Sequence, residues 1–212
     1  MRGSHVLVRP IDARADAAPL YAASHPPEGD VAIWAYLPDG PYESADDFRR
    51  MLAWAEASDD PLFFTLALPP DARPAGLASY LRITPEHGVI EVGHIWFGAL
   101  LQRTTVATEA LYLLARHAFD DLGYRRLEWK TNALNAASRR AAERFGFTFE
   151  GVFRKHQVVR GRNRDTAWYA MTDDEWPAIR DGFDAWLAPE NFDRDGAQQR
   201  PLRDLIDERR GR

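Results

Sequence analysis

The segment Val89–Phe97 carries two side chains that could move a proton, the carboxylate of Glu91 and the imidazole of His94, within an otherwise apolar run. Such a run predicts a β-strand, in which side chains three residues apart point to opposite faces of the sheet. We therefore expect Glu91 and His94 not to act as one pair. We interpret His94 as a core histidine whose ring is satisfied by hydrogen bonds.

A candidate anion site follows directly along the chain. Arg103, Thr104, Thr105 and Thr108 surround the point where a helix is expected to begin. The first amides of a helix have no partner within it, and the helix dipole adds partial positive charge there. Arg103 adds a formal charge and the threonines add hydroxyl donors. Pyrophosphate is an anion that suits this arrangement, although threonines at such a joint also serve as simple caps.

The sequence pattern predicts the elements that position these groups. The expected strands are Val6–Pro10, Leu62–Leu68, Ala75–Ile83, Val89–Phe97, Arg126–Thr131, Phe147–Val159 and Asp165–Met171, the last two joined by a turn at Gly161–Arg164. The expected helices are Asp12–Ala23, Ser44–Ala57, Val106–Leu122, Asn135–Gly146 and Thr172–Trp186, the last beginning with a capping box of Thr172 and Glu175. This order predicts a mixed α/β fold, with helices on both faces of the sheet.

Three segments lie outside these elements. His25–Tyr42 is rich in proline, glycine and aromatic residues, so it is either a structured loop over the core or a lid over a substrate. Asp193–Arg212 is highly charged, and its large apolar residues Leu202, Leu205 and Ile206 favour a short, weakly docked helix. Met1–His5 resembles an added leader without a structural role. We expect one domain over residues 6–187 and a charged C-terminal extension over residues 188–212.

Composition excludes several classes of function. The net charge of −5 makes binding to nucleic acid a poor default, although one local basic site could hold an acidic ligand. The absence of cysteine excludes disulfides, thiolate zinc sites and cysteine nucleophiles. The histidines and acidic residues lack metal-ligand spacing, so no metal site is expected. No apolar run could span a bilayer, and we expect a soluble cytoplasmic protein that contacts no membrane.

Several motifs downstream occur in a recognisable order. They are Arg126–Asn132, Asn135–Ser138, Glu143–Gly151, Gly161–Thr166 and Tyr169–Asp173, followed by Trp176. Together they resemble the GNAT superfamily of N-acetyltransferases, and most closely its branch of ribosomal-protein N-terminal acetyltransferases. The resemblance spans roughly Val8 to Trp186. It implies the GNAT fold, with a central twisted mixed sheet of about six to seven strands.

The resemblance also implies a cofactor, acetyl-coenzyme A, and a place for it. Two neighbouring strands, here Val89–Phe97 and Arg126–Thr131, would splay apart and admit the pantetheine arm beside the strand edge. The residues implied for the cofactor are the main chain near Ile95, Trp96 and Phe97, the amides of Arg103, Thr104, Thr105, Val106, Ala107 and Thr108, and the side chains of Asn132, Asn135 and Ser138. Glycines usual in the family are replaced by Thr105 and Ala107, which implies weaker or rearranged pyrophosphate binding.

Catalytic roles are likewise implied by the resemblance. The substrate amine would attack the thioester directly, which requires a neutral amine. Glu91 lies where the family often keeps a carboxylate base, although it could instead be a half-buried carboxylate paired with an arginine. Many relatives have a tyrosine acid where Ala142 lies here, and in the closer branch a serine matching Ser138 serves near the sulfur. Ser138 could otherwise lie on the helix surface or contact a phosphate, and Tyr169 is a weaker candidate for the acid.

The acceptor is expected to be a protein N-terminus or a small amine, and the side chains of Trp34, Tyr36, Tyr42 and His156 could line its site. Aromatic residues in a loop also serve as plain packing. A homodimer is an open expectation for the assembly. Two rival readings remain, a non-catalytic module that binds acyl-coenzyme A and an enzyme that transfers another acyl group, such as succinyl.

Overall fold

The computed structural model describes residues 1–211, which form two compact units. The first unit comprises Met1–Thr84 and Ile90–Leu114, and the second comprises Pro85–Val89 and the chain from Ala115 onward. Four strands belong mainly to the first unit and three to the second. Within residues 1–211, every helix is too short or too polar to span a bilayer.

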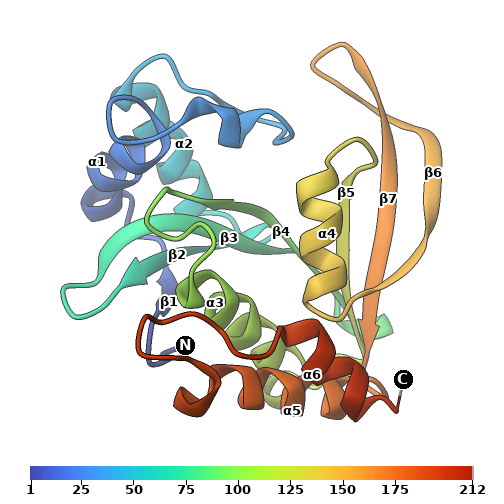
Figure 1. The fold of residues 1–212 in the computed structure, drawn as a ribbon. Coiled ribbons are helices and arrows are strands. Elements are labelled where there is room, and N and C mark those ends of the chain that lie inside the picture. The colour runs from blue at the N-terminus through green and yellow to red at the C-terminus, as the bar shows by residue number, and fades with distance from the viewer. Residues whose placement is uncertain (212) are drawn as a thin grey trace. The chain divides into compact units, whose positions relative to one another are not determined.

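The first unit is built on neighbouring strands. Their order is β1 (Leu7–Pro10), β2 (Leu62–Leu68), β3 (Arg73–Thr84) and β4 (Val89–Phe97) (Figure 1). β1 pairs antiparallel with β2, and β2 pairs antiparallel with β3, so that Phe63 lies directly opposite Ser79. Directly opposed residues share one face of a sheet, and this pair therefore identifies the Phe63 face of the first unit.

Three helices complete the first unit, α1 (Ala13–Ser24), α2 (Ala45–Glu56) and α3 (Thr105–Arg116). α1 and α2 lie side by side in Figure 1. Asp12 and Ser44 begin α1 and α2 as side-chain caps, which satisfies amides that have no partner within the helix. Both helices agree with the expected ranges, and Ser44 begins the second as expected.

Helices cover both faces of the first-unit strands. On the Phe63 face, Leu20 of α1 and Leu52 of α2 are fully buried in one apolar cluster with Leu77 of β3. On the opposite face, the Tyr80 hydroxyl donates to the carbonyl of Leu114 in α3. Because alternate residues of β3 point to opposite faces, α1 and α2 pack on one side and α3 on the other.

The second unit holds the remaining strands in the order β5 (Arg126–Asn132), β7 (Arg162–Thr172) and β6 (Thr148–Val159), each neighbouring pair antiparallel. Its helices are α4 (Ala136–Arg144), α5 (Trp176–Leu187) and α6 (Leu202–Arg209). A π-helical turn at His117–Asp121 continues the chain after α3. The expected mixed α/β fold of six to seven strands is confirmed.

Two boundaries in the second unit differ from the expected ones. The β6–β7 turn is Arg160–Gly161 rather than Gly161–Arg164, because Val159 already pairs with Arg162. Arg160 and Gly161 have φ of 51° and 72°, the left-handed pair that suits a tight hairpin turn. The last large helix begins at Trp176 rather than Thr172. Glu175 does accept hydrogen bonds from the Thr172 amide and hydroxyl, as half of the expected box, but across a turn before the helix.

The C-terminal residues form a firmly packed helix, whereas weak docking was expected. Leu202, Leu205 and Ile206 of α6 are at most 4% exposed. A Cβ on Gly182 of α5 would lie 2.5 Å from Ile206, so α5 and α6 approach closely only because residue 182 is glycine. These residues belong to the body of the second unit, and the compact units do not divide near residue 187.

The N-terminal residues also have a structural role, which corrects the expectation that Met1–His5 lack one. The amides of Ser4, His5 and Val6 donate to the carboxylate of Glu109 in α3 at 2.6–2.9 Å. Glu109 is only 5% exposed, and a buried carboxylate requires such donors. The start of the chain is thus bound to α3 within the first unit.

Candidate active site

The backbone of β4 is irregular at His94. His94 has φ +48°, a left-handed conformation that residues other than glycine seldom adopt. Residues of this kind mark bulges, which change the direction of the following side chains. Strained residues are also concentrated at functional sites. This irregularity lies directly before Ile95–Phe97, the segment expected to hold the cofactor arm.

The imidazole of His94 lies on the Phe63 face of the first unit. Its Nδ1 lies 3.0 Å from the Ser79 hydroxyl oxygen, and its ring centre lies 5.2 Å from that of Phe63. The same hydroxyl contacts the carbonyl oxygen of Gly93 at 3.1 Å. His94 is half-buried, so it is a hydrogen-bonded residue at the edge of the core rather than within it.

Glu91 lies on this face as well, which corrects the expectation that Glu91 and His94 point to opposite faces. A Cβ on Gly93 would lie 2.9 Å from Leu81 and 3.6 Å from Oε1 of Glu91. Leu81 shares the Phe63 face with Ser79, two residues before it. The left-handed residue interrupts the alternation of β4, and both ionisable groups therefore share one face.

Glu91 is paired with an arginine. It is 3% exposed, and its Oε2 accepts a hydrogen bond from Nη1 of Arg82 at 2.7 Å. This is the alternative that the sequence left open for Glu91. An ion pair occupies part of the carboxylate and stabilises its charged form. The geometry thus gives Glu91 an electrostatic role on this face, and whether it also accepts a proton stays a prediction.

The loop between β4 and α3 is held by local hydrogen bonds. The Gln102 side chain donates to the Phe97 carbonyl, and the Thr104 hydroxyl donates to the Leu101 carbonyl at 2.7 Å. Arg103, at φ +60°, is exposed and makes no ion pair with any other residue among 1–211. The loop thus presents a cation beside the start of α3.

The first turn of α3 fits an anionic ligand. Thr105 and Val106 are half-buried, while Ala107 and Thr108 are buried. α3 has twelve residues, enough for its aligned peptide dipoles to favour negative charge at its start. The Thr104 hydroxyl donates to the Leu101 carbonyl just before this turn. The chemistry of these donors matches the phosphates of coenzyme A.

The end of β4 offers main chain rather than side chains. Ile95 and Phe97 are half-buried, whereas Trp96 is 4% exposed and packs against Trp34 with ring centres 5.6 Å apart. The Trp96 side chain is therefore part of the core. Its role toward the cofactor, as predicted, would be limited to backbone groups.

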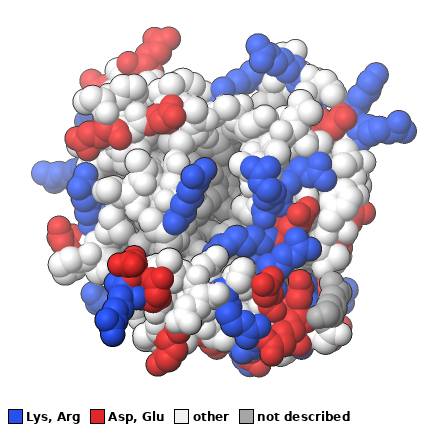
Figure 2. All heavy atoms as spheres, in the orientation of Figure 1, with Lys and Arg blue, Asp and Glu red and all other residues white. Residues whose placement is uncertain are grey.

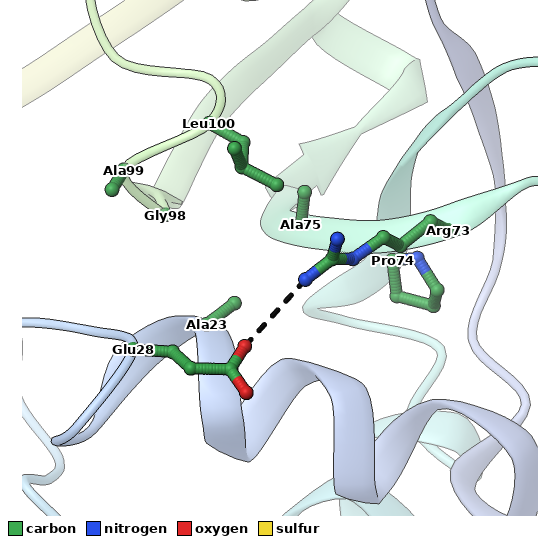
Figure 3. A pocket seen from close by; sticks show the side chains of 8 residues that line it. All are labelled: Ala23, Glu28, Arg73, Pro74, Ala75, Gly98, Ala99 and Leu100. Carbon is green, nitrogen blue, oxygen red and sulfur yellow. Dashed lines mark ion pairs between the residues drawn. The ribbon is translucent and has the colours of Figure 1, made fainter.

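A small hollow lies beside the end of β4 (Figure 3). Arg73 at the start of β3 and Glu28 after α1 form an ion pair across it, with Nη2 and Oε2 3.5 Å apart. Gly98 lies in its wall, where a Cβ would meet the Ala75 carbonyl at 2.8 Å. The hollow is too small for a substrate. The ion pair links the segment after α1 to the start of β3 within the first unit.

The aromatic loop after α1 is mainly a structured cover for the core. Trp34 is 3% exposed, and Tyr42 packs edge-on against it with ring centres 5.4 Å apart. Tyr36 differs, because 43% of it is exposed. Of the three aromatic residues predicted to line an acceptor site, the structure thus leaves only Tyr36 largely accessible.

His25, which the sequence did not single out, anchors this loop. Its Nε2 accepts a hydrogen bond from the Tyr42 amide at 3.0 Å, and its Nδ1 contacts the Ser24 hydroxyl and the Tyr21 carbonyl. Burial lowers the pKa of His25, against the opposing effect of the Tyr21 carbonyl. A neutral ring is also what the bond from Tyr42 requires, since only an unprotonated nitrogen can accept.

In the second unit, Ser138 lies in the first turn of α4 beside the indole of Trp129. Trp129 Nε1 donates to the Ser138 hydroxyl oxygen at 3.0 Å, and Asn135 accepts a bond from the Ser138 amide as the cap of α4. An indole nitrogen can only donate, so the hydroxyl hydrogen of Ser138 is directed elsewhere. Ser138 is thereby positioned as a donor.

The two asparagines predicted to contact the cofactor have local roles that use only their oxygens. Asn132 accepts from the Leu134 amide at 2.9 Å, and Asn135 accepts from Ser138. Within residues 1–211, the side-chain nitrogens of Asn132 and Asn135 donate no hydrogen bond. Each asparagine thus presents a donor group at the β5–α4 joint.

Tyr169 is less suited to acid catalysis. It is fully buried, its hydroxyl accepts from Nε of Arg139 at 3.0 Å, and it contacts Glu143 at 3.3 Å. The phenol is thus part of a closed network between β7 and α4. This agrees with its lower rank in the sequence.

His156 belongs to an aromatic cluster on the β6–β7 hairpin. Its Nδ1 lies 3.0 Å from the Thr166 hydroxyl, and the rings of Phe153 and Trp168 lie 5.6 and 5.9 Å from its own. Phe153 is 52% exposed, so the cluster is open to solvent. The cluster could receive a ligand, as predicted for His156.

A charged pair on β5 lies beneath this cluster. Burial raises the pKa of Glu128, but hydrogen bonds from Lys130 and Arg126 outweigh it and hold that pKa below the usual value. The Lys130 ammonium also lies 4.0 Å from the centre of the Trp168 ring. Lys130 is therefore committed to a structural role in the second unit.

The charges of this acidic chain are unevenly distributed. Lys and Arg side chains gather in Figure 2 where Figure 1 draws α4 and the β6–β7 hairpin. In the sequence, α4 contains Arg139 and Arg140 and the hairpin contains Arg154, Lys155, Arg160 and Arg162. The second unit thus has a local basic surface despite the negative net charge.

Comparison with known proteins identifies the family. The sequence model of the acetyltransferase (GNAT) domain matches residues 5–148. A GCN5-related N-acetyltransferase from Brucella melitensis is 44% identical, with coverage of 97% of this chain and 93% of its own, and superposes with a TM-score of 0.92. This chain belongs to the GNAT family. It is accordingly a transferase, and acetyltransferases of this family use acetyl-coenzyme A as co-substrate.

Other relatives agree with the GNAT assignment. A GNAT-family protein from Chromobacterium violaceum ATCC 12472 is 41% identical over 83% of this chain and 87% of its own, with a TM-score of 0.77. A Vibrio cholerae structure named for ribosomal-protein-serine acetylation is 17% identical over 81% of this chain and 95% of its own, with a TM-score of 0.69, and shares the fold alone. No functionally curated protein matches the sequence.

The sequence reasoning missed three residues of this GNAT site. Ser79 and Arg82 of β3 contact His94 and Glu91, and His25 fixes the aromatic loop. Ser79 carried a usable signal, since it is a polar residue within an apolar strand and so needs a partner. Arg82 and His25 carried none, because their partners are distant in the sequence or depend on the backbone of β4.

Proposed function

We propose that this GNAT enzyme acetylates a primary amine, either a protein N-terminus or a small amine, and that it falls in the ribosomal-protein N-terminal acetyltransferase branch. The bulged β4, followed directly by the open start of α3 beside Arg103, carries the proposal. The motifs from Asn135 to Trp176 support the branch.

The chain offers donors for acetyl-coenzyme A. The amides of Arg103–Thr108 and the Arg103 guanidinium would hold the pyrophosphate, and main-chain groups of Ile95–Phe97 would hold the pantetheine arm. The side-chain nitrogens of Asn132 and Asn135 would donate to the cofactor. Acetyl-coenzyme A supplies an activated acetyl thioester when bound.

Ser138 would act as a donor near the sulfur. Its oxygen accepts from Trp129, which leaves its hydrogen for another acceptor. A departing thiolate is stabilised by such a donor as negative charge develops on it. The acceptor amine would reach the Phe63 face of β4, where Glu91 and His94 lie.

Turnover with a panel of amines tests this function. The purified protein is incubated with acetyl-coenzyme A and peptides with free N-termini, or with polyamines and other small amines, and products are read by mass spectrometry. Acetylated amine with release of one coenzyme A per product supports the proposal. Tight binding of acetyl-coenzyme A without turnover would assign the chain to the non-catalytic alternative, and preferential use of succinyl-coenzyme A would change the acyl group.

A further inference from the structure

We propose that His94 is the group that removes the proton from the acceptor amine, and that Ser79 positions its ring. This rests on the proposed acetyl transfer to an amine. It reassigns to His94 a role for which the sequence favoured Glu91. All of the contacts that support this role lie within the first unit.

The Ser79 hydroxyl determines the tautomer of His94. A serine hydroxyl has a single hydrogen, and a main-chain carbonyl can only accept. The contact between Ser79 Oγ and the Gly93 carbonyl therefore uses that hydrogen. The 3.0 Å contact with His94 must then be a bond from Nδ1–H to Ser79 Oγ. In the neutral ring this places the basic lone pair on Nε2.

His25 provides an internal comparison. Ser24 donates to the Leu20 carbonyl, so His25 also carries its hydrogen on Nδ1, and its Nε2 accepts from the Tyr42 amide. The two histidines share one arrangement but differ in exposure, since His25 is 4% exposed and His94 is half-buried. His25 is therefore held within the core, whereas His94 is partly exposed on the Phe63 face.

The left-handed backbone gives His94 its direction. Without the irregularity at φ +48°, residue 94 would point to the α3 face of the strand, away from Ser79. A strained conformation persists only where its surroundings enforce it, and here Ser79 and Phe63 hold the ring. The imidazole therefore sits at the point where β4 departs from regular geometry, directly before Ile95–Phe97.

Imidazole is better matched to this proton transfer than a carboxylate. A peptide α-amine ordinarily has a pKa of about 7.7–8.0, imidazole about 6.5 and glutamate about 4.3. Because the ordinary pKa of imidazole is about two units closer to that of the amine, the equilibrium constant for proton transfer to imidazole is roughly a hundredfold larger than that for transfer to a carboxylate. Glu91 is also engaged by Arg82, and its charge on the same face would stabilise the imidazolium.

The charged groups on this face form two pairs. Glu91 of β4 pairs with Arg82 of β3, whose amide donates to Asp60. Asp16 of α1 pairs with Arg9 of β1 and accepts from Thr65 of β2. His25, which packs against Phe48 of the apolar cluster, is a further titratable group. β2 contributes Phe63, and α1 and α2 contribute the apolar cluster that includes it. A titration seen in the activity can therefore be traced to a short set of residues.

The step conserves atoms and charge. Nε2 of His94 takes one proton from the ammonium, and the free amine nitrogen forms a bond to the acetyl carbon. The carbon–sulfur bond breaks, and its electron pair leaves with the sulfur, which is protonated. The amide nitrogen loses its second proton, and His94 releases the first to water, so one ammonium and one thioester yield one amide, one thiol and one proton.

The test compares the pH dependence of kcat/KM for the wild type, His94→Asn, Ser79→Ala and Glu91→Gln. Asparagine tolerates the left-handed backbone, so His94→Asn keeps the strand geometry, and His94→Gln is a second variant should it misfold. We expect His94→Asn to lose about a hundredfold or more in kcat/KM and to lose the acidic limb of the wild-type profile, with acetyl-coenzyme A binding unchanged. The exposed His87→Gln is the control and should match the wild type.

Ser79 positions His94 in this proposal, so its variants need a measurement that distinguishes this role from a purely structural one. Ser79→Ala should lower kcat with little change in KM and shift the acidic limb, while Ser79→Thr, which keeps the hydroxyl, should restore the wild-type profile. Nitrogen-15 NMR of the unliganded protein gives a readout besides activity, and we expect the His94 ring as the Nδ1–H tautomer.

The outcomes separate the two proposals. An Nε2–H tautomer overturns the inference whatever the activity. A wild type that turns over while His94→Asn keeps its rate and acidic limb overturns it as well, and loss of that limb in Glu91→Gln instead would return the role to Glu91. A wild type that acetylates no amine overturns the proposed function, and the base role with it.

Discussion

At the scale of single residues, hydroxyl groups determine what the neighbouring groups of this enzyme can do. The hydroxyls of Ser24, Ser79 and Ser138 make contacts whose donor and acceptor roles follow from the partners. The first two direct a lone pair onto Nε2 of a histidine, and the third leaves a hydrogen free to donate. These assignments make the chemistry testable one side chain at a time.

Replacement of Ser138 should separate catalysis from binding. If its hydroxyl donates to the leaving sulfur, Ser138→Ala lowers kcat by about a hundredfold, because a donor aimed at developing charge acts mainly in the transition state. Steady-state kinetics and calorimetry with acetyl-coenzyme A measure the two effects. Ser58→Ala, at a serine outside the site, is the control. A loss confined to cofactor affinity would instead make Ser138 a phosphate contact.

His25 should make the stability of the protein sensitive to acid. Burial lowers its pKa in the folded state, so between that value and the ordinary 6.5 the unfolded chain binds more protons. Its contribution to stability is complete above about pH 6.5 and is lost as the pH falls below it, with a limiting slope of about 1.4 kcal/mol per pH unit.

Urea unfolding at pH 7.5 and 5.5 measures this effect. We expect the wild type to lose more stability on acidification than His25→Asn, which cannot titrate. The matched substitution His87→Asn, at an exposed histidine, should leave the pH dependence unchanged. Equal losses in the wild type and His25→Asn would show that the anchor of the aromatic loop does not depend on the protonation of His25.

At the scale of elements, short segments at the two ends of the chain pack against longer helices. α6 packs its apolar side onto α5, where Gly182 and Gly146 leave room for Ile206. The amides at the start of the chain bind Glu109 of α3, the helix whose first turn is the proposed anion site. Both ends of the chain thus stabilise elements that lie far from them in sequence.

Truncation of Ile206 tests the role of α6. Ile206 is 1% exposed, so Ile206→Ala should lower the free energy of unfolding by about 2–5 kcal/mol through lost burial and the cavity left behind. Val158→Ala, at a residue 76% exposed, is the control and should change it by less than about 0.5 kcal/mol. Denaturant unfolding measures both. Similar values for the two variants would mean that α6 is not docked in solution.

At the scale of the whole molecule, each unit contains candidate functional residues of its own. The first unit holds the bulged β4, the ion pair of Glu91 and the start of α3, while the second holds Ser138 and the asparagines of the β5–α4 joint. A ligand that binds only the folded state stabilises it by mass action, so cofactor binding can be read from thermal unfolding.

Acetyl-coenzyme A should raise the melting temperature. At a hundred times its dissociation constant it contributes about 2.7 kcal/mol, which for a chain of this length corresponds to about 5–11 °C. Arg103→Asn, which keeps the left-handed backbone but removes the charge, should show a smaller rise at the same concentration, whereas Arg14→Gln in α1 should behave as the wild type. Differential scanning calorimetry checks this, and an unchanged rise in Arg103→Asn would exclude Arg103 from the phosphate site.

The sequence by itself determined most of the elements. The period of apolar residues and the helix starts at Ser44 and Asn135 placed most strands and helices, because these signals depend on neighbours along the chain. The family motifs and the candidates Glu91 and Ser138 could also be recognised at this level. The extent of α6 could be anticipated from three apolar residues, but its firm packing could not.

Only the tertiary structure decided how the candidates are used. The alternation of a regular strand predicted opposite faces for Glu91 and His94, and one left-handed residue reversed that result, since β4 bulges where β3 and β2 hold the ring. The partners Ser79, Arg82 and Trp129 meet their targets across strands and helices, so no spacing along the chain reveals them. Trp34 and Tyr42 became core for the same reason: burial depends on what packs against a residue, which the sequence pattern does not specify.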